Sequence, residues 1–173
     1  MKNQVVLVNE NDDEIGLMAK LEAHQKGLLH RAFSIFLFNT KGELLLQQRA
    51  YGKYHSEGLW SNTCCSHPFP NEATLVGAKR RLFEEMGIHS PLHFLYSFRY
   101  EAAVDNGLIE HELDHIFWAV SDEKPKIDPL EVLDYKYISA QDLREDMKNN
   151  PGRYTEWFKI CLDDVLSKIN LPG

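Results

Sequence analysis

The sequence has few cysteines, no long apolar run and no excess of positive charge. Its 173 residues include three cysteines, an odd number that argues against a disulfide framework. No apolar stretch approaches the ~20 residues of a membrane-spanning helix, and the N-terminus turns acidic too soon for a signal peptide. The net charge is -7, whereas general binders of nucleic acid or membrane surfaces are more often basic. We therefore expect a cytoplasmic protein that binds neither.

Internal repeats, low-complexity tracts and linker-like segments are also missing from the sequence. Hydrophobic residues make up 43% of the chain, which is enough for a sizeable core. A chain of this length is too short for two comfortable domains. We expect one domain over residues 1–173, acting as a monomer.

Strand-like and helix-like segments alternate along the chain and predict a mixed sheet with helices packed on it. Residues 31–38 and 42–48 flank the turn signal Asn39-Thr40-Lys41-Gly42 and predict a β-hairpin with two largely buried strands. Three more strands and two helices are expected further on: strands near 93–103, 112–120 and 134–138, a helix from a Ser139 cap to about Asn149, and a final helix after Pro151-Gly152.

A long segment, residues 50–70, separates the hairpin from the next helix. It is rich in glycine, proline and aromatic residues, and long ordered loops of this kind are usually functional. The helix after it is predicted to begin at an Asn71 N-cap and to end at Gly87. Apolar residues recur at helical spacing between these ends: Leu75, Ala78, Leu82 and Met86.

Two adjacent cysteines, Cys64 and Cys65, lie in this loop-like segment, with His67 two positions on. Neighbouring cysteines bridge poorly because the intervening peptide is strained, so we expect thiols. The pair could be small core residues, part of a metal site, or a reactive thiol beside a packing residue. The residues alone leave these alternatives open.

The helix near residues 72–88 resembles a Nudix box in its spacing. Ser66 stands where the box has its glycine, and Arg81 stands where it has its central glutamate. This arginine removes a metal ligand and adds a phosphate-pairing group, which argues against ordinary Nudix hydrolysis. Taken alone, the carboxylates would more readily be interpreted as a solvated, salt-bridged helix face. The matching residues are Glu72, Arg80, Leu82, Glu84, Glu85, Gly87 and Ile88.

Histidines and glutamates from separate segments could together bind a metal. Glu110 and Glu112 alternate on a predicted strand and so point to the same face. With His24, His30 and His67 they offer mixed nitrogen and oxygen ligands, which suit Mn²⁺, Zn²⁺ or iron better than Mg²⁺. No pair has diagnostic spacing, and a lone histidine is more often structural. We expect four other histidines to lie outside such a site: His55, His89, His93 and His115.

Four cations from separate segments could clamp a small polyanion. Each alone is an ordinary surface residue, but arginine pairs bidentately with phosphate and lysine adds a point charge. They are Lys20, Arg49, Lys53 and Arg81.

The motifs in this order resemble those of type I isopentenyl-diphosphate delta-isomerases, the Nudix-like branch. The resemblance extends from about Val5 to Leu166. It implies a Nudix-like α/β fold, with a mixed β-sheet sandwiched between helices. It also implies interconversion of isopentenyl and dimethylallyl diphosphate through a tertiary carbocation, in isoprenoid precursor biosynthesis. The segments that carry it are WSNTCCSHP (60–68), HRAFSIFLFN (30–39), RRLFEEMGI (80–88), FRYEA (98–102), EHELDHIF (110–117) and YTEWF (154–158).

The resemblance also implies roles for individual residues. Cys65 and Glu112 would carry the proton transfers, with Tyr100 beside the carboxylate and Trp157 stabilising the cation through its π face. Cys64 would be a packing residue. Metal ligands for Mn²⁺ or Zn²⁺ would be His24, His30, His67, Glu110 and Glu112. The prenyl diphosphate substrate would bind Lys20, Arg49, Lys53 and Arg81, with Mg²⁺ held by Glu85 and no flavin.

Two other functions remain open from the residues. A Nudix pyrophosphohydrolase would act on a nucleotide or coenzyme diphosphate, need no thiol, and release phosphate. A non-catalytic metal- or phosphate-binding module would turn over no prenyl diphosphate.

Overall fold

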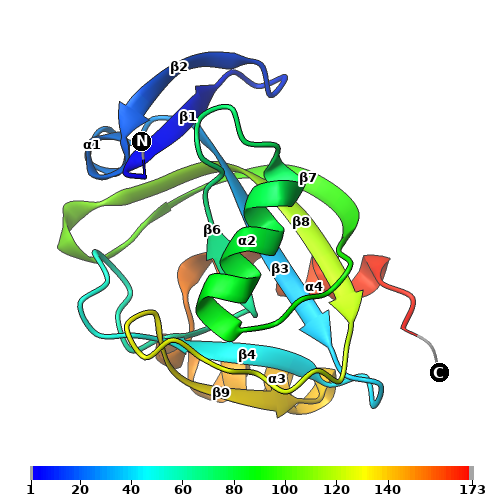
Figure 1. The fold of residues 1–173 in the computed structure, drawn as a ribbon. Coiled ribbons are helices and arrows are strands. Elements are labelled where there is room, and N and C mark those ends of the chain that lie inside the picture. Colours follow the sequence, from blue (N-terminus) through cyan, green and yellow to red (C-terminus); the bar gives the residue numbers. More distant parts are fainter. Residues whose placement is uncertain (1, 172–173) are drawn as a thin grey trace.

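A nine-stranded mixed sheet organises the chain in the computed structural model, which describes residues 2–171. At its centre, β3 (His30–Phe38) pairs in parallel with β8 (Ile109–Val120) along its whole length. β7 (His93–Ala103) pairs antiparallel with the other edge of β8. Figure 1 shows these three long strands behind helix α2. The parallel pair sets functional residues of β3 and β8 side by side.

The remaining strands surround this centre. β6 (Cys64–Ser66) pairs antiparallel with β3, and the N-terminal hairpin joins the start of β3 through Leu7 opposite His30. β4 meets β3 only at Phe38 opposite Leu44, and then pairs with β9 and β5. The bounds of these strands are β1 (Gln4–Val8), β2 (Glu14–Ala19), β4 (Leu44–Arg49), β5 (Trp60–Ser61) and β9 (Val132–Ile138).

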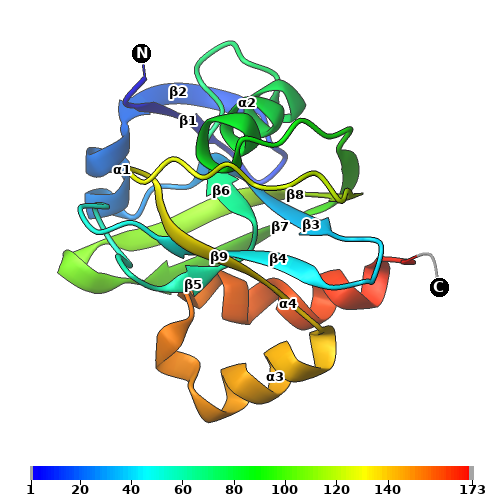
Figure 2. The ribbon, with the colours of Figure 1, turned by 60° about the horizontal axis from the view of Figure 1, so that its bottom comes forward.

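Strand β3 is buried on both faces because its alternate side chains enter two different cores. Phe33 and Ile35 pack with Leu82 of α2 (Thr74–Met86). Phe36 packs on the opposite side with α4 (Glu156–Lys168). Figure 2 shows α2 on one side of the sheet and α3 and α4 on the other. The predicted architecture, a mixed sheet between helices, is therefore confirmed.

Helix α2 begins later than the sequence predicts. Its N-cap is Ala73, and no side chain caps it, because Asn71 adopts a left-handed conformation with φ 64°. The predicted Asn71 cap is therefore wrong. Gly87 ends the helix as expected, with φ 65°, and a Cβ there would lie 2.6 Å from the Lys126 carbonyl oxygen. Glycine meets both demands at this position.

The other predicted helices are confirmed. Ser139 Oγ accepts a hydrogen bond from Asp142 N and caps α3 (Ala140–Asn149). Short 3-10 turns at Asp105–Gly107 and Pro151–Arg153 precede β8 and α4, and α1 (Lys20–Lys26) follows the N-terminal hairpin. No helix among residues 2–171 is long and apolar enough to cross a membrane.

Two sequence predictions about the sheet need correction. Residues 50–70 are not one continuous loop, because β5 and β6 form within them. The predicted hairpin forms at residues 39–42, but its strands separate after a single pair, since β6 and β8 take the two sides of β3. This separation opens the region in which the candidate site lies.

Candidate active site

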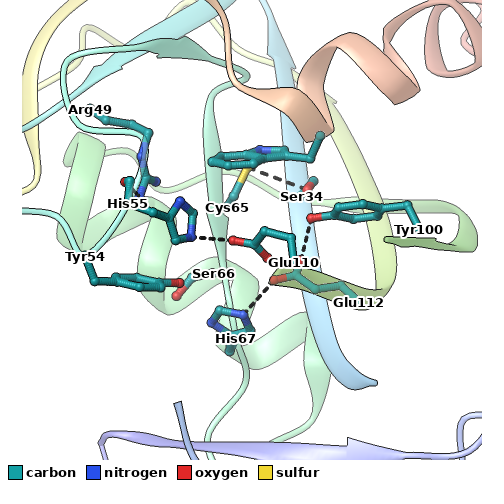
Figure 3. Close-up of a pocket in the computed structure, with 11 residues that line it drawn as sticks. Ser34, Arg49, Tyr54, His55, Cys65, Ser66, His67, Tyr100, Glu110 and Glu112 are labelled. Atoms are coloured by element: carbon teal, nitrogen blue, oxygen red, sulfur yellow. Dashed lines mark hydrogen bonds and ion pairs between the residues drawn. The ribbon is translucent and has the colours of Figure 1, made fainter. Parts of the chain in front are cut away.

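Three histidines and two glutamates meet where β3 and β8 begin. His30 opens β3, and the parallel register sets it opposite Glu112 of β8. His67 follows β6, and its Nε2 lies 3.0 Å from Glu112 Oε1 and 3.2 Å from His30 Nε2. His24 of α1 completes the group, with Nε2 3.4 Å from Glu110 Oε2. Figure 3 shows His67, Glu110 and Glu112 converging.

The ring orientations of two of these histidines leave their Nε2 atoms as ligands. His24 Nδ1 lies 2.6 Å from the Lys20 carbonyl oxygen, and His30 Nδ1 lies 2.8 Å from that of Leu28. A carbonyl oxygen can only accept a hydrogen bond, so each Nδ1 carries the proton and each Nε2 presents a lone pair. Backbone contacts of this kind commonly orient metal-binding imidazoles.

The group could hold a divalent metal cation. Ligand atoms of His24, His30, His67 and Glu112 all lie within 4.8 Å of one another. Glu110 Oε2 is buried and has no hydrogen-bond partner. Buried carboxylate oxygens are costly when unpaired, so a cation would satisfy it. The mixture of imidazole and carboxylate donors suits such a cation.

Burial and charge shape the protonation of this group. Burial lowers the pKa of His67 to about 3, despite the attraction of Glu112, so the ring is neutral at physiological pH. Burial opposes the charge of His24, but hydrogen bonding and attraction by Glu110 outweigh it and raise the pKa of His24. Burial likewise opposes ionisation of Glu110, yet its polar neighbours hold the pKa of that carboxyl well below its usual range.

His55 was expected to lie outside the site, and this expectation is wrong. Its side chain is buried, and Nε2 lies 2.5 Å from Glu110 Oε1. His89, His93 and His115 do lie elsewhere, against Phe83, Trp118 and Asp12 respectively.

Cys65 of β6 faces the opposite helix layer from Cys64. Trp157 Nε1 of α4 donates a hydrogen bond to Cys65 Sγ at 3.0 Å, and the thiol donates to Asn62 Oδ1 at 2.9 Å. Ser34 Oγ lies 3.6 Å from the same sulfur. Cys64 is fully buried in the core beneath α2, which confirms the expectation that it is a packing residue.

The surroundings of Cys65 keep its proton on the sulfur. Burial raises the pKa of the thiol to about 12, and the negative charge of Asp114 adds to this. Ser34 connects the two residues, because its Oγ lies 2.7 Å from Asp114 Oδ2. The ordinary pKa of this thiol would be 9.0. Cys65 is therefore a thiol, and not a thiolate, at neutral pH.

Tyr100 and Glu112 form a second hydrogen-bonded pair in the same cavity. Tyr100 Oη donates to Glu112 Oε2 at 2.8 Å, while Oε1 of this carboxylate faces the histidines. Burial raises the pKa of Tyr100 well above its usual value, and the charge of Glu112 adds to the effect. Together with Cys65 and Trp157, the pair lines a small cavity of about 30 Å³ (Figure 3). Glu112 thus borders both the metal-binding group and the cavity.

The four predicted cations divide between two places. Lys20, Lys53 and Arg81 line an open cleft of about 530 Å³, which also borders His67. Arg49 lies apart from them among the residues of the small cavity, with its guanidinium 5.2 Å from the centre of the Trp157 ring. Burial lowers the pKa of Lys20, and the charges of the neighbouring cations lower it further. The cleft therefore has an excess of positive charge next to the cavity.

The sequence of this chain is similar to those of one known protein family. A NUDIX domain model matches residues 28–158. An isopentenyl-diphosphate Delta-isomerase 2 from Aromatoleum aromaticum is 49% identical over 173 residues, covering 100% of this chain and 92% of that protein. An isopentenyl-diphosphate Delta-isomerase from Pectobacterium atrosepticum is 52% identical over 157 residues, 91% of this chain and 88% of its own. The chain belongs to the isopentenyl-diphosphate Delta-isomerase family.

Solved structures with the same fold are more distant from this isomerase-family chain. DR0079 from Deinococcus radiodurans superposes with a TM-score of 0.71 at 17% identity, covering 85% of this chain and 90% of that one. A MutT protein from Methanosarcina mazei gives 0.65 at 19% identity, with 82% and 96% covered. At such identities these similarities support the Nudix fold alone.

Besides His55, three polar residues of the site in this isomerase-family chain carry little or no signal in the sequence. Asp114 and Ser34 lie behind Cys65, and Glu131 lies in the basic cleft, where it pairs with Lys53 and, at 3.2 Å, with Arg81. Asp114 has a weak signal in the sequence, since it continues the two-residue alternation of Glu110 and Glu112. The others become neighbours of the site only through tertiary packing.

Proposed function

We propose that this chain is an isomerase that interconverts isopentenyl diphosphate and dimethylallyl diphosphate, using Cys65 and Glu112 for the two proton transfers. One observation carries the assignment of residues. A protonated thiol and a carboxylate with an adjacent tyrosine line the same small cavity, which adjoins a cleft of positive charge. Full-length similarity to isopentenyl-diphosphate Delta-isomerases supports the activity.

The reaction moves a double bond by adding one proton and removing another. A proton joins the terminal CH₂ of isopentenyl diphosphate through the π electrons, and the positive charge develops on the tertiary carbon. A base then removes a proton from the CH₂ next to the carbon bearing the diphosphate. The electron pair of that C–H bond forms the new double bond to the tertiary carbon. We assign one transfer to Cys65 and the other to Glu112 with Tyr100. The reaction is reversible, so each group donates in one direction and accepts in the other.

The walls of the cavity suit a carbocation intermediate. The aromatic ring of Trp157 borders the cavity, and an electron-rich π face attracts a cation at short range. Water must also be kept away from the bound intermediate, because water in contact with a tertiary carbocation would capture it as an alcohol. We therefore assign Trp157 to stabilising the cation, while the surrounding side chains exclude water.

The diphosphate group would be held in the basic cleft. Lys20, Lys53 and Arg81 supply the positive charge, and Glu85 lies next to Arg81, with 2.6 Å between Arg81 Nη2 and Glu85 Oε1. When bound, Mn²⁺ or Zn²⁺ at the histidines would supply positive charge beside Glu112, and Mg²⁺ at Glu85 would neutralise the diphosphate. Firm binding of the diphosphate fixes the small alkene relative to the two proton-transfer groups.

Incubation with isopentenyl diphosphate in deuterated water tests this function. We expect dimethylallyl diphosphate carrying deuterium from solvent, detected by NMR, with no release of phosphate. The same sample tests the hydrolase alternative, which predicts phosphate and no double-bond migration. Absence of both products at enzymatic rates would leave only a non-catalytic binding module and would overturn the proposal.

A further inference from the structure

The two carboxylates of the metal-binding group are arranged in the same way. Glu112 directs Oε1 toward the histidines, while its Oε2 is held by Tyr100 at 2.8 Å. Glu110 directs Oε2 toward His24, at 3.4 Å, while its Oε1 lies 2.5 Å from His55 Nε2. Each carboxylate therefore directs one oxygen toward His24, His30 and His67, while its other oxygen contacts a residue outside these three. His55 contacts the outer oxygen of Glu110, as Tyr100 contacts the outer oxygen of Glu112.

The ring contacts of His55 indicate which of its nitrogens faces Glu110 as N–H. A carboxylate oxygen at 2.5 Å would repel a nitrogen lone pair, so Nε2 carries a proton. Nδ1 lies 3.0 Å from Ser56 Oγ, which can donate to it. Nε2 makes no aligned hydrogen bond, so the contact is a close polar approach to the carboxylate. His55 thus turns its Nε2–H edge toward Glu110 Oε1.

The backbone around His55 is fixed by contacts from two directions. Arg49 Nη2 donates to the His55 carbonyl oxygen at 3.1 Å. The next residue, Ser56, has a φ of 54°, which is unfavourable for a residue with a side chain. Asp105, in the turn between β7 and β8, holds it by accepting a hydrogen bond from Ser56 N at 2.7 Å. Asp105, 49 residues away, thus stabilises an unfavourable backbone conformation at Ser56, directly after His55. Such a conformation is typical of functional sites, and here it helps to fix the direction of the His55 side chain.

His55 lies on the outer side of Glu110 and not within the main group of ligands. The four ligand atoms that cluster together belong to His24, His30, His67 and Glu112, whereas His55 groups only with His24 and Glu110. Its ring also packs edge-on against Trp157, with centroids 5.7 Å apart. The residue therefore joins the metal-binding group to the wall of the reaction cavity.

We propose that His55 is a positioning residue that holds Glu110 Oε1 and thereby presents Oε2 to the metal. This inference rests on the metal site of the proposed function. Outer partners of metal-binding carboxylates fix the ligand before the metal arrives, and their loss typically costs about 10- to 100-fold in metal affinity.

Replacement of His55 by two amides gives a matched test. The amide nitrogen of glutamine reaches about as far as Nε2 of histidine, whereas that of asparagine corresponds to Nδ1. We expect His55→Ala and His55→Asn to bind Mn²⁺ about 10- to 100-fold more weakly than wild type, and His55→Gln to recover most of the affinity. Calorimetric titration with Mn²⁺ alone measures this. His93→Ala, at an exposed histidine, is the control and should bind like wild type.

Pulsed EPR of bound Mn²⁺ separates positioning from direct ligation. Wild type and His55→Gln should show the same number of coupled imidazole nitrogens. Loss of one nitrogen in His55→Gln would make His55 a ligand and overturn the proposal, as would wild-type affinity in His55→Ala. If wild type itself binds no Mn²⁺, the metal site and this proposal both fall. Turnover of isopentenyl diphosphate, measured separately, would still decide the isomerase activity.

Discussion

Trp157 Nε1 donates a hydrogen bond to Cys65 Sγ at 3.0 Å, across 92 residues of sequence. The contact joins α4 to β6 and directs the edge of the indole at the thiol. It accounts for two features at once: the sulfur is held in place, and the aromatic ring borders the cavity beside it. A change at either residue should therefore affect turnover, whereas a change at Cys64, in the other core, should not.

Replacement of Cys65 should remove nearly all turnover. General acid–base groups typically contribute about 10²- to 10⁴-fold, and a substrate that fills the small cavity leaves no room for a substituting water. Cys65→Ala is therefore expected to lose at least this factor in kcat, and Cys65→Ser to keep at most a trace. Cys64→Ala should lose only packing. Rates come from NMR with isopentenyl diphosphate, with circular dichroism as the folding control. Loss of activity in Cys64→Ala together with a nearly wild-type Cys65→Ala would contradict the assignment.

The free energy of unfolding should fall above pH 9. The folded Cys65 thiol has a pKa of about 12, raised from 9.0 by burial and by Asp114. Above pH 9 the unfolded chain loses this proton while the folded chain keeps it, so the stabilisation is complete below pH 9 and is lost toward pH 12. The slope is about 1.4 kcal/mol per pH unit for one group. Urea unfolding of wild type and Cys65→Ala at pH 8 to 10.5 should show curves that converge with this slope. A constant difference between them would show that the thiol keeps an ordinary pKa.

His67→Ala should lower bound metal and activity together. The imidazole is neutral because burial lowers its pKa to about 3, so it is available as a ligand throughout the physiological range. We expect less Mn²⁺ or Zn²⁺ per chain by elemental analysis and a parallel loss of turnover, with chelator-treated wild type behaving in the same way. His89→Ala, at an exposed histidine, serves as the control. Full metal content with full activity in His67→Ala would remove His67 from the site.

Glu131→Gln should strengthen binding of a diphosphate. Glu131 pairs with Lys53 and Arg81, so its negative charge competes with a ligand for the same cations. Pairs of this partly exposed kind contribute about 0.2–1 kcal/mol, which corresponds to roughly 1.5- to 5-fold in affinity. Calorimetry with inorganic pyrophosphate measures the change, and Glu145→Gln controls for the loss of one surface charge. Arg81→Glu should have the opposite effect. Weaker binding by Glu131→Gln would show that Glu131 helps to hold the ligand.

The sequence predicted those parts of the molecule that depend on local pattern. The apolar run at residues 31–38, next to a turn signal, predicted the largely buried strand β3, and Ser139 and Gly87 marked helix ends by their own conformational preferences. Alternation also indicated that Glu110 and Glu112 share a face, which the strand assignment of β8 bears out.

Features that depend on distant contacts could not be predicted in this way. β5 and β6 have two and three residues, too few to show a period, and they form because β4 and β3 offer pairing partners. Asn71 is a residue type that commonly caps helices, but its left-handed φ differs from the extended conformation of an N-cap residue. His55 belongs to the site because it contacts Glu110 and because Asp105 accepts a hydrogen bond from the neighbouring Ser56 N. No local pattern in the sequence connects these residues.

The burial of the histidine cluster has a kinetic consequence. His24 and His30 have no exposed surface, and His67 exposes only 11% of its side chain. Among the ligands, His67 borders the open cleft, so a cation must enter from that side and lose its water before it reaches the buried nitrogens. We therefore expect slow exchange, so that chelation and reloading before a Mn²⁺ titration need long equilibration.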